Sequence, residues 1–267
     1  MNRSLLVLSL LMAAASGACQ VTEVEATPGL SWSSLEGSVA ASDLTTGGGL
    51  KESTMEELGI GTRHSIAQLE LKLIEGDVHW DIFAQSSDFS GVGTLADDIT
   101  LEGVTLDDGE GEVATDLHIG LYGLRWLKNV SREDDLSVNV GASLVVAEFE
   151  LELSQALEGS NGDVTGEFKD TGRDVLIPIP LPVLNLVYDH ESFDVHFMLS
   201  GMKVWSSDAS GHIIDLDVNV SVAAFDDLGE LVVGYRSFEL ELEHSSDERV
   251  EIDVNLNGPY LAYRLSF

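Results

Sequence analysis

The last eight residues, YLAYRLSF (260–267), alternate between two kinds of side chain. One parity is apolar throughout and the other is mixed: Leu261, Tyr263, Leu265 and Phe267 against Tyr260, Ala262, Arg264 and Ser266. Because a β-strand points successive side chains to opposite faces, this pattern predicts a strand. Its apolar face needs an apolar neighbour, which is either a protein core or lipid.

Four other segments alternate as strictly, at residues 65–75, 78–85, 135–145 and 213–223. Their apolar faces carry Ala67, Leu69, Leu71 and Leu73; Val78, Trp80, Ile82 and Ala84; Leu136, Val138, Val140, Ala142 and Leu144; and Ile214, Leu216, Val218, Val220 and Val222. Weaker alternation occupies 30–41, 114–127, 176–188, 193–205 and 231–243. With the C-terminal segment, these patterns predict about ten strands, with eight as the alternative.

Two features interrupt this regularity. Leu144 and Val146 share one parity, whereas the apolar residues that follow, Phe149, Leu151 and Leu153, have the other. This change predicts either a β-bulge or a strand that leaves its first environment. The segment 176–188 also carries prolines at 178, 180 and 182, and because proline cannot donate to a ladder, its first half is expected at a rim or a bulge.

The connections alternate in length along the chain. Long polar segments fall near 42–61, 87–113, 154–174 and 244–256, and short ones at 74–77, 128–135, 189–192 and 225–230. The segment 206–211 takes a long position but is short. Long loops at one end and short turns at the other are typical of an outer-membrane β-barrel.

The length of the apolar faces favours lipid over a soluble core. The alternating runs last eight to eleven residues, about what a tilted strand needs to cross the hydrocarbon region. Aromatic residues also lie toward the strand ends, as a membrane girdle requires: Trp80, Trp126, Tyr188, Trp205, Tyr263 and Phe267. The predicted fold is therefore all-β, a closed antiparallel up-and-down transmembrane β-barrel.

The N-terminus has the pattern of an export signal. Arg3 precedes an apolar run over 5–15 and small residues before Cys19, which predicts a signal peptide over 1–18. We expect a short leader over 19–28 and the barrel over 29–267. Cys19 is the only cysteine, so it can form no intrachain disulfide, but it could carry a lipid. An exported lipid-anchored soluble β-protein therefore stays open as an alternative.

The charge restricts the partners. The chain has 13 Lys and Arg against 47 Asp and Glu, a formal net charge of −34, which would repel nucleic acid. Its 44% hydrophobic content is too high for a disordered acidic chain. Both values fit a folded protein in which acidic and apolar residues are interleaved.

The signal-like N-terminus, the alternating strands, the unequal loops and the C-terminal YLAYRLSF resemble small bacterial outer-membrane β-barrels of the OmpA-like and OmpW-like kind. Segments such as LGIGTRHSIAQLELKL and DLHIGLYGLRW also resemble an uncharacterised group of such barrels. The resemblance implies a monomer in the outer membrane of Gram-negative bacteria, in contact with lipid and lipopolysaccharide. It further implies that Leu261, Tyr263, Leu265 and Phe267 are read by the barrel-assembly machinery.

A membrane barrel would turn its polar faces into the lumen. The clearest of these residues are Glu70, Lys72, His79, Asp81, Asn139, Asp215, Asp217 and Arg264. Because isolated charges are costly inside a narrow barrel, we expect Lys72 and Arg264 to form ion pairs there. The lumen is then a polar plug in a structural or surface-interaction protein, or alternatively a narrow cation-preferring channel. No cofactor or resident metal is expected.

Enzymatic alternatives rest on weaker patterns. His244 and Ser246, with Glu248 and Glu251, loosely resemble the His-x-Ser pair of outer-membrane lipid A deacylases and would suit a lipid-modifying enzyme.

Two other patterns contain acidic residues. The ten-stranded omptin proteases use Asp/His pairs at the extracellular rim; His212 with Asp215 could take that role only by a forced match, because no paired aspartates stand at matching positions. The loop LDDGEGE (106–112) does not fit the twelve-residue calcium loop but could bind divalent cations that bridge to lipopolysaccharide phosphates.

Overall fold

The computed structural model describes residues 22–43, 51–60, 64–94, 99–101, 104–106, 112–158, 164–205, 209–224, 229–245 and 248–267. Ten of its strands form the barrel: β1 (Glu23–Asp43), β3 (His64–Glu75), β4 (Val78–Gly93), β7 (Val113–Glu133), β8 (Leu136–Glu158), β9 (Val164–His190), β10 (Phe193–Trp205), β11 (Ala209–Ala224), β12 (Gly229–Ser245) and β13 (Glu248–Ser266). Three short strands lie in the connections: β2 (Lys51–Thr54), β5 (Ile99–Leu101) and β6 (Val104–Leu106).

The ten strands close into one antiparallel up-and-down barrel. Each pairs with its neighbours in sequence, and β1 pairs with β13, where Leu30 lies opposite Leu261. The backbone N–H of Phe267 donates to the Val24 carbonyl at 2.9 Å, so the seam extends to the chain end. The predicted fold and the count of ten strands, rather than eight, are confirmed. The first strand begins at Glu23, within the segment 19–28 that we expected to precede the barrel.

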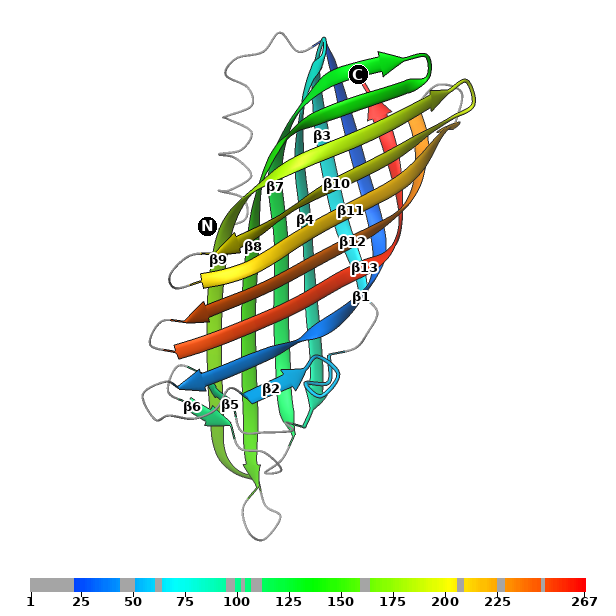
Figure 1. The fold of residues 1–267 in the computed structure, drawn as a ribbon. Helices are drawn as coiled ribbons and strands as arrows, with labels where there is room; N and C mark the ends of the chain where they lie inside the picture. The colour runs from blue at the N-terminus through cyan, green and yellow to red at the C-terminus, as the bar shows by residue number, and fades with distance from the viewer. Residues whose placement is uncertain are drawn as a thin grey trace.

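The two ends of the barrel differ in the connections that they carry (Figure 1). Both ends of the described chain lie beside the close turns after β3, β7 and β9 and the connection after β11, and we call this the short-turn end. The opposite, long-loop end holds β2, β5 and β6. Two predicted long loops are wrong in extent, because β8 and β9 extend through most of 154–174 and β13 already begins at Glu248.

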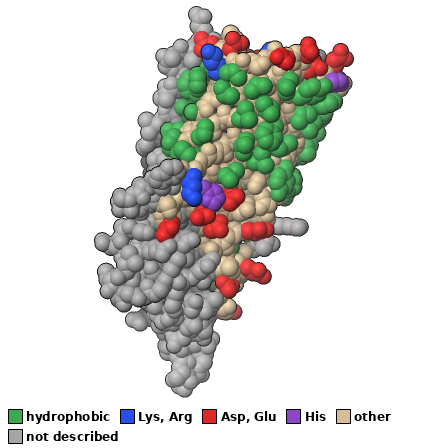
Figure 2. Space-filling model, in the orientation of Figure 1, with side chains coloured by type: hydrophobic (Ala, Val, Ile, Leu, Met, Phe, Trp, Pro, Cys, Tyr) green, Lys and Arg blue, Asp and Glu red, His purple; other side chains and the backbone are tan. Residues whose placement is uncertain are grey.

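An apolar belt covers the outside of the short-turn half. In Figure 2 hydrophobic side chains fill the upper part of the surface, with acidic side chains above and below them. Exposed members include Leu30, Trp126, Val140, Leu199, Val218, Val233 and Leu261, while the alternate residues of the same strands point inward. This outward-apolar sense is the predicted one and suits hydrocarbon contact. Among the described residues, no helix is long and apolar enough to cross a bilayer.

The long-loop half has the opposite polarity. On β8 the outward positions change from Val146 to Glu148, and the inward positions change from Ser143 to Val145. The ladders to β7 and β9 keep one register through this point, with shifts only at Asn129/Ser131 and Ala156/Glu158 among the described pairs. The strand therefore passes from one environment to another without a bulge. Of our two interpretations of the parity change, the change of environment is correct and the β-bulge is wrong.

Two ladders stop where the polarity changes. Pairing of β9 with β10 ends at Val183 and Ser200, and pairing of β1 with β3 ends at Ser33 and His64. The three prolines of β9 lie just beyond Val183, where a missing N–H costs no ladder bond to β10. Beyond these points a sheet of β4, β7, β8 and β9 faces a sheet of β10 to β13 with β1 and β2.

An apolar core fills the space between these two sheets. Its least exposed members include Leu35, Leu58, Ile66, Phe89, Ile119, Leu121, Phe149, Leu153, Leu181, Ile213, Phe238, Leu240 and Val254. The segment 55–60 packs into this core, and Ile60 bridges to Gly91 of β4. The barrel interior is therefore closed by hydrophobic packing in its long-loop half, as in a soluble sandwich.

Candidate functional site

All eight polar residues that we predicted for the lumen lie on the inner wall. His79, Asp81, Asn139 and Asp215 are buried, and Glu70, Lys72, Asp217 and Arg264 line the cavity or the vestibule of the lumen. They come from strands on all sides of the barrel, β3, β4, β8, β11 and β13. The up-and-down topology thus gathers residues that lie far apart in the sequence.

An arginine–carboxylate cluster crosses the lumen next to the apolar core, on the side of the short-turn end. Asp215 is 1% exposed and accepts two hydrogen bonds from Arg236, Nε to Oδ1 at 2.8 Å and Nη2 to Oδ2 at 2.9 Å. The Arg125 guanidinium lies 3.6 Å from the same Asp215 carboxylate and 3.3 Å from the carboxylate of Glu70. Arg236 also donates to Gln85 at 2.9 Å, so both guanidinium groups are held by several partners.

The ring of Phe83 supports this cluster. The Arg125 guanidinium lies 4.1 Å from its centroid and that of Arg236 lies 5.5 Å away, both within cation–π range. Phe83 lies opposite Gly123 of β7, and a Cβ on that glycine would stand 2.1 Å from the ring. Gly123 therefore lets the aromatic ring lie against the barrel wall, beneath both arginines.

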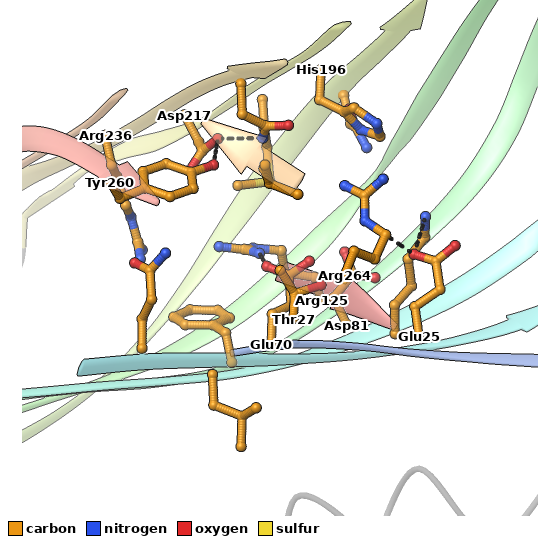
Figure 3. A pocket seen from close by; sticks show the side chains of 18 of the residues that line it. Glu25, Thr27, Glu70, Asp81, Arg125, His196, Asp217, Arg236, Tyr260 and Arg264 are labelled. Atoms are coloured by element: carbon orange, nitrogen blue, oxygen red, sulfur yellow. Dashed lines mark hydrogen bonds and ion pairs between the residues drawn. The ribbon is translucent and has the colours of Figure 1, made fainter. Parts of the chain in front are cut away.

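A second network lies nearer the short-turn end (Figure 3). Glu25 contacts Lys72 at 3.3 Å and Arg264 at 3.8 Å, and Arg264 also contacts Glu230 at 2.8 Å. Lys72 and Arg264 thus form the ion pairs that we expected from them. On the other side of the close-up, Asp217 accepts hydrogen bonds from Tyr260 and Asn219, at 2.9 and 2.8 Å.

Two connected spaces remain between these groups. A cavity of about 90 Å³ is lined by residues of both networks, among them Asp81, Arg125, Asp217 and Arg264. A wider vestibule of about 460 Å³ shares Glu25, Lys72, Asn185, His196 and Arg264 with it and reaches the turn residues Gly76 and Asp77. The polar lumen is therefore a blind space that opens at the short-turn end and ends at the arginine cluster.

Sequence reasoning missed the residues that close the lumen. Arg125 and Arg236 were not predicted to face the lumen, because each lies in a weakly alternating segment, within GLYGLRW and GYRSFEL. Glu25, Asn185 and His196 were missed as well. One feature of the sequence could have identified the two arginines. The chain has only 13 Lys and Arg, so an arginine inside an apolar run is expected to have a carboxylate partner.

Comparison with solved structures supports the fold. The Escherichia coli outer-membrane protease OmpT gives a TM-score of 0.60 at 10% identity, covering 94% of this chain and 99% of that one. This chain has the fold of a bacterial outer-membrane β-barrel. No family model and no curated protein matches it.

Two other solved structures give lower TM-scores. The Pseudomonas putida toluene transporter TodX gives a TM-score of 0.35 at 8% identity, covering 97% of this chain and 92% of that one. Ail, the attachment invasion locus protein of Yersinia pestis, gives 0.31 at 9% identity, covering 91% and 98%. A likeness to OmpT at 10% identity shows the fold alone and assigns no activity to this chain.

The structure separates His212 from Asp215, the pair suggested for a proteolytic role. His212 points outward from β11 and contacts Glu239 at 2.9 Å and Glu241 at 3.3 Å, whereas Asp215 points inward, so the proteolytic pairing of these two residues is wrong. Their odd sequence separation explains this, because it places them on opposite faces of one strand.

Several other predicted features lie outside what the structure describes. They are Ser246, the side chains of His244, Glu248 and Glu251, most of the loop 106–112, the signal segment 1–18 and Cys19. Within the described residues, no group of three or more His, Cys, Asp or Glu side chains is placed to hold a metal ion.

Proposed function

We propose that this chain is a non-enzymatic, non-conducting outer-membrane β-barrel whose lipid-embedded half anchors a rigid acidic body at the cell surface. One observation carries the proposal: the interior of the long-loop half is a packed apolar core, with Leu58, Ile66, Leu240 and Val254 each at most 1% exposed. A hydrated ion would have to displace this core in order to cross. The structural and surface role is therefore favoured over the narrow channel.

The outer face of that body is acidic. Its outward positions include Glu36, Asp88, Asp116, Glu148, Glu150, Glu152, Glu239 and Glu241. Short turns of bacterial outer-membrane barrels face the periplasm, so this face would stand above the outer leaflet. There it would meet the phosphates of lipopolysaccharide, with divalent cations as bridges, and any basic molecule outside the cell.

The belt and the C-terminal strand complete the proposal. The belt would contact membrane lipid directly, and Leu261, Tyr263 and Leu265 are on its outward parity. Phe267 is 76% exposed at the end of the β1–β13 seam. These four side chains are accessible in the way that reading by the assembly machinery would require.

Planar-bilayer recording tests the non-conducting role. The purified, folded protein is expected to insert without unitary conductance steps, whereas cation-selective steps would favour the channel. Different migration of boiled and unboiled samples on a gel should establish that the barrel is folded before each recording.

Cysteine labelling tests the orientation, because Cys19 is the only native cysteine. In a Cys19→Ser background, Glu150→Cys should react with a membrane-impermeant maleimide on intact cells. Asn139→Cys, which lines the vestibule at the short-turn end, should react only after the outer membrane is opened. The reverse pattern would reject the proposed placement.

A further inference from the structure

The blind lumen contains more hydrogen-bond acceptors than its own donors satisfy. Asp81 is 4% exposed, and its Oδ1 has no hydrogen-bond partner. The side-chain oxygens of Asn185 and Asn219 are also buried without a partner. All three residues line the 90 Å³ cavity, although they come from β4, β9 and β11. A buried acceptor without a hydrogen-bond donor costs free energy, so a donor from outside the chain would stabilise these three oxygens.

The charges in the cavity point the same way. Each Lys and Arg that lines it contacts a carboxylate: Lys72 with Glu25, Arg125 with Glu70, Arg236 with Asp215 and Arg264 with Glu230. Two lining carboxylates, Asp81 and Asp217, stand outside these pairs. Asp217 is hydrogen-bonded by the neutral groups of Tyr260 and Asn219. The local excess is therefore negative, and it lies with the unsatisfied acceptors.

We infer that the lumen binds a small organic cation that carries a primary ammonium group and enters from the short-turn end. An ammonium group has three donors and no acceptor, which complements acceptor oxygens on Asp81, Asn185 and Asn219. Its single positive charge offsets part of the negative charge that Asp81 and Asp217 bring to the cavity. The cavity volume limits the occupant to a small molecule, and Met198 and Val232 in its lining give an alkyl chain apolar contacts.

The vestibule supplies a route to this site. Six carboxylates line the vestibule against three cationic side chains: Glu23, Glu25, Asp77, Asp189, Asp194 and Glu230 against Lys72, Arg132 and Arg264. An acid-rich mouth raises the local concentration of cations. The arginine cluster and the apolar core behind it end the route, so a cation that enters from this end leaves by the same end.

The test measures cation-dependent stabilisation of the full folded chain in detergent. In 150 mM NaCl, n-butylammonium should raise the temperature at which the folded band is lost on a gel, and the rise should saturate with concentration. Butyltrimethylammonium has the same charge without N–H donors and should give less than a third of this rise. Equal rises for the two ligands would overturn the proposal, because they would show general charge screening.

Two carboxylate variants localise the effect. Asp81→Asn removes the unpaired charge with little change in shape and should abolish the butylammonium-dependent rise. Asp88→Asn, whose carboxylate is 88% exposed on the outer wall, should keep it. Retention of the full rise in Asp81→Asn, or its loss in both variants, would overturn the lumen site.

The choice of occupant has its own test. Mg²⁺ in place of butylammonium should give a rise that is the same in the wild type and in Asp81→Asn. A larger Mg²⁺-dependent rise that is lost only in Asp81→Asn would assign the site to a metal ion and reject the ammonium ligand. If Asp81→Asn does not form the heat-modifiable band of a folded barrel, Asn219→Leu takes its place. This substitution removes one acceptor and should weaken butylammonium binding at least threefold.

Discussion

Val140 and Glu150 point outward from the same strand, β8, yet one is apolar and the other is charged. Their inward neighbours show the reverse order, with Asn139 near the short-turn end and Phe149 and Leu151 beyond it. The strand keeps its register between these positions. Alternation therefore tells which residues share a face, whereas the type of residue on each face tells which solvent surrounds that part of the strand.

The two halves also fill their interiors differently. The short-turn half satisfies buried charges through ion pairs such as Arg236–Asp215 and leaves polar cavities. The long-loop half buries apolar side chains in a packed core. The first arrangement depends on every partner being present, since a buried charge that loses its partner is very costly. The second depends on close packing.

The largest effect is expected from Asp215→Ala, at the boundary between the halves. The change leaves Arg236 without its bidentate partner and removes a contact of the buried Arg125. Loss of a buried ion-pair partner should lower the free energy of unfolding by about 3–5 kcal/mol, measured by urea titration in lipid vesicles. The exposed pair of Asp88 and His118 supplies a control, because Asp88→Ala should cost less than about 1 kcal/mol. Similar losses in both variants would contradict the lumen assignment.

A lysine in the belt is expected to have the next largest effect. Val140 is 39% exposed on the outward face near the middle of the β8 belt segment. A charge there would meet hydrocarbon, so Val140→Lys should lower the free energy of unfolding in vesicles by about 2–4 kcal/mol. Val140→Leu keeps the face apolar and is the matched control. An unchanged stability of Val140→Lys would mean that this face meets water.

The third effect concerns the wall beneath the arginine cluster. Gly123→Ala would place a Cβ against the Phe83 ring and push it toward Arg125 and Arg236. Overpacking of this kind should cost about 1–3 kcal/mol in the same titration. A smaller side chain at position 83 should relieve the clash, so the double variant Gly123→Ala/Phe83→Leu should lose less than the sum of the two single variants. Strict additivity would show that the ring does not depend on Gly123.

Much of the fold could be predicted from the sequence because alternation is a local property. The strict segments gave strand positions and faces correctly, as 135–145 and 213–223 show. The loop lengths were overestimated where a strand changes environment. In 154–174 the predicted polar loop is mostly strand, and a search for membrane-type alternation misses it because its outward face no longer needs to be apolar.

The lumen could be predicted only in part. Period two assigns Asp215 and Asp217 to the inner wall, but it cannot tell which strand lies across the barrel from them. The pairing of Asp215 with Arg236 follows from the register of β11 and β12, and its contact with Arg125 follows from closure of the barrel. These are long-range properties, so no spacing within one segment could reveal them.

The smallest expected effect is on the outer face of the long-loop half. Glu150→Lys changes the outward charge on β8 ten residues beyond Val140, where water replaces lipid in our interpretation. A surface substitution away from buried partners should change the free energy of unfolding by no more than about 0.5 kcal/mol. A loss above about 2 kcal/mol would mean that the belt extends past Glu150 and that both halves face the same solvent.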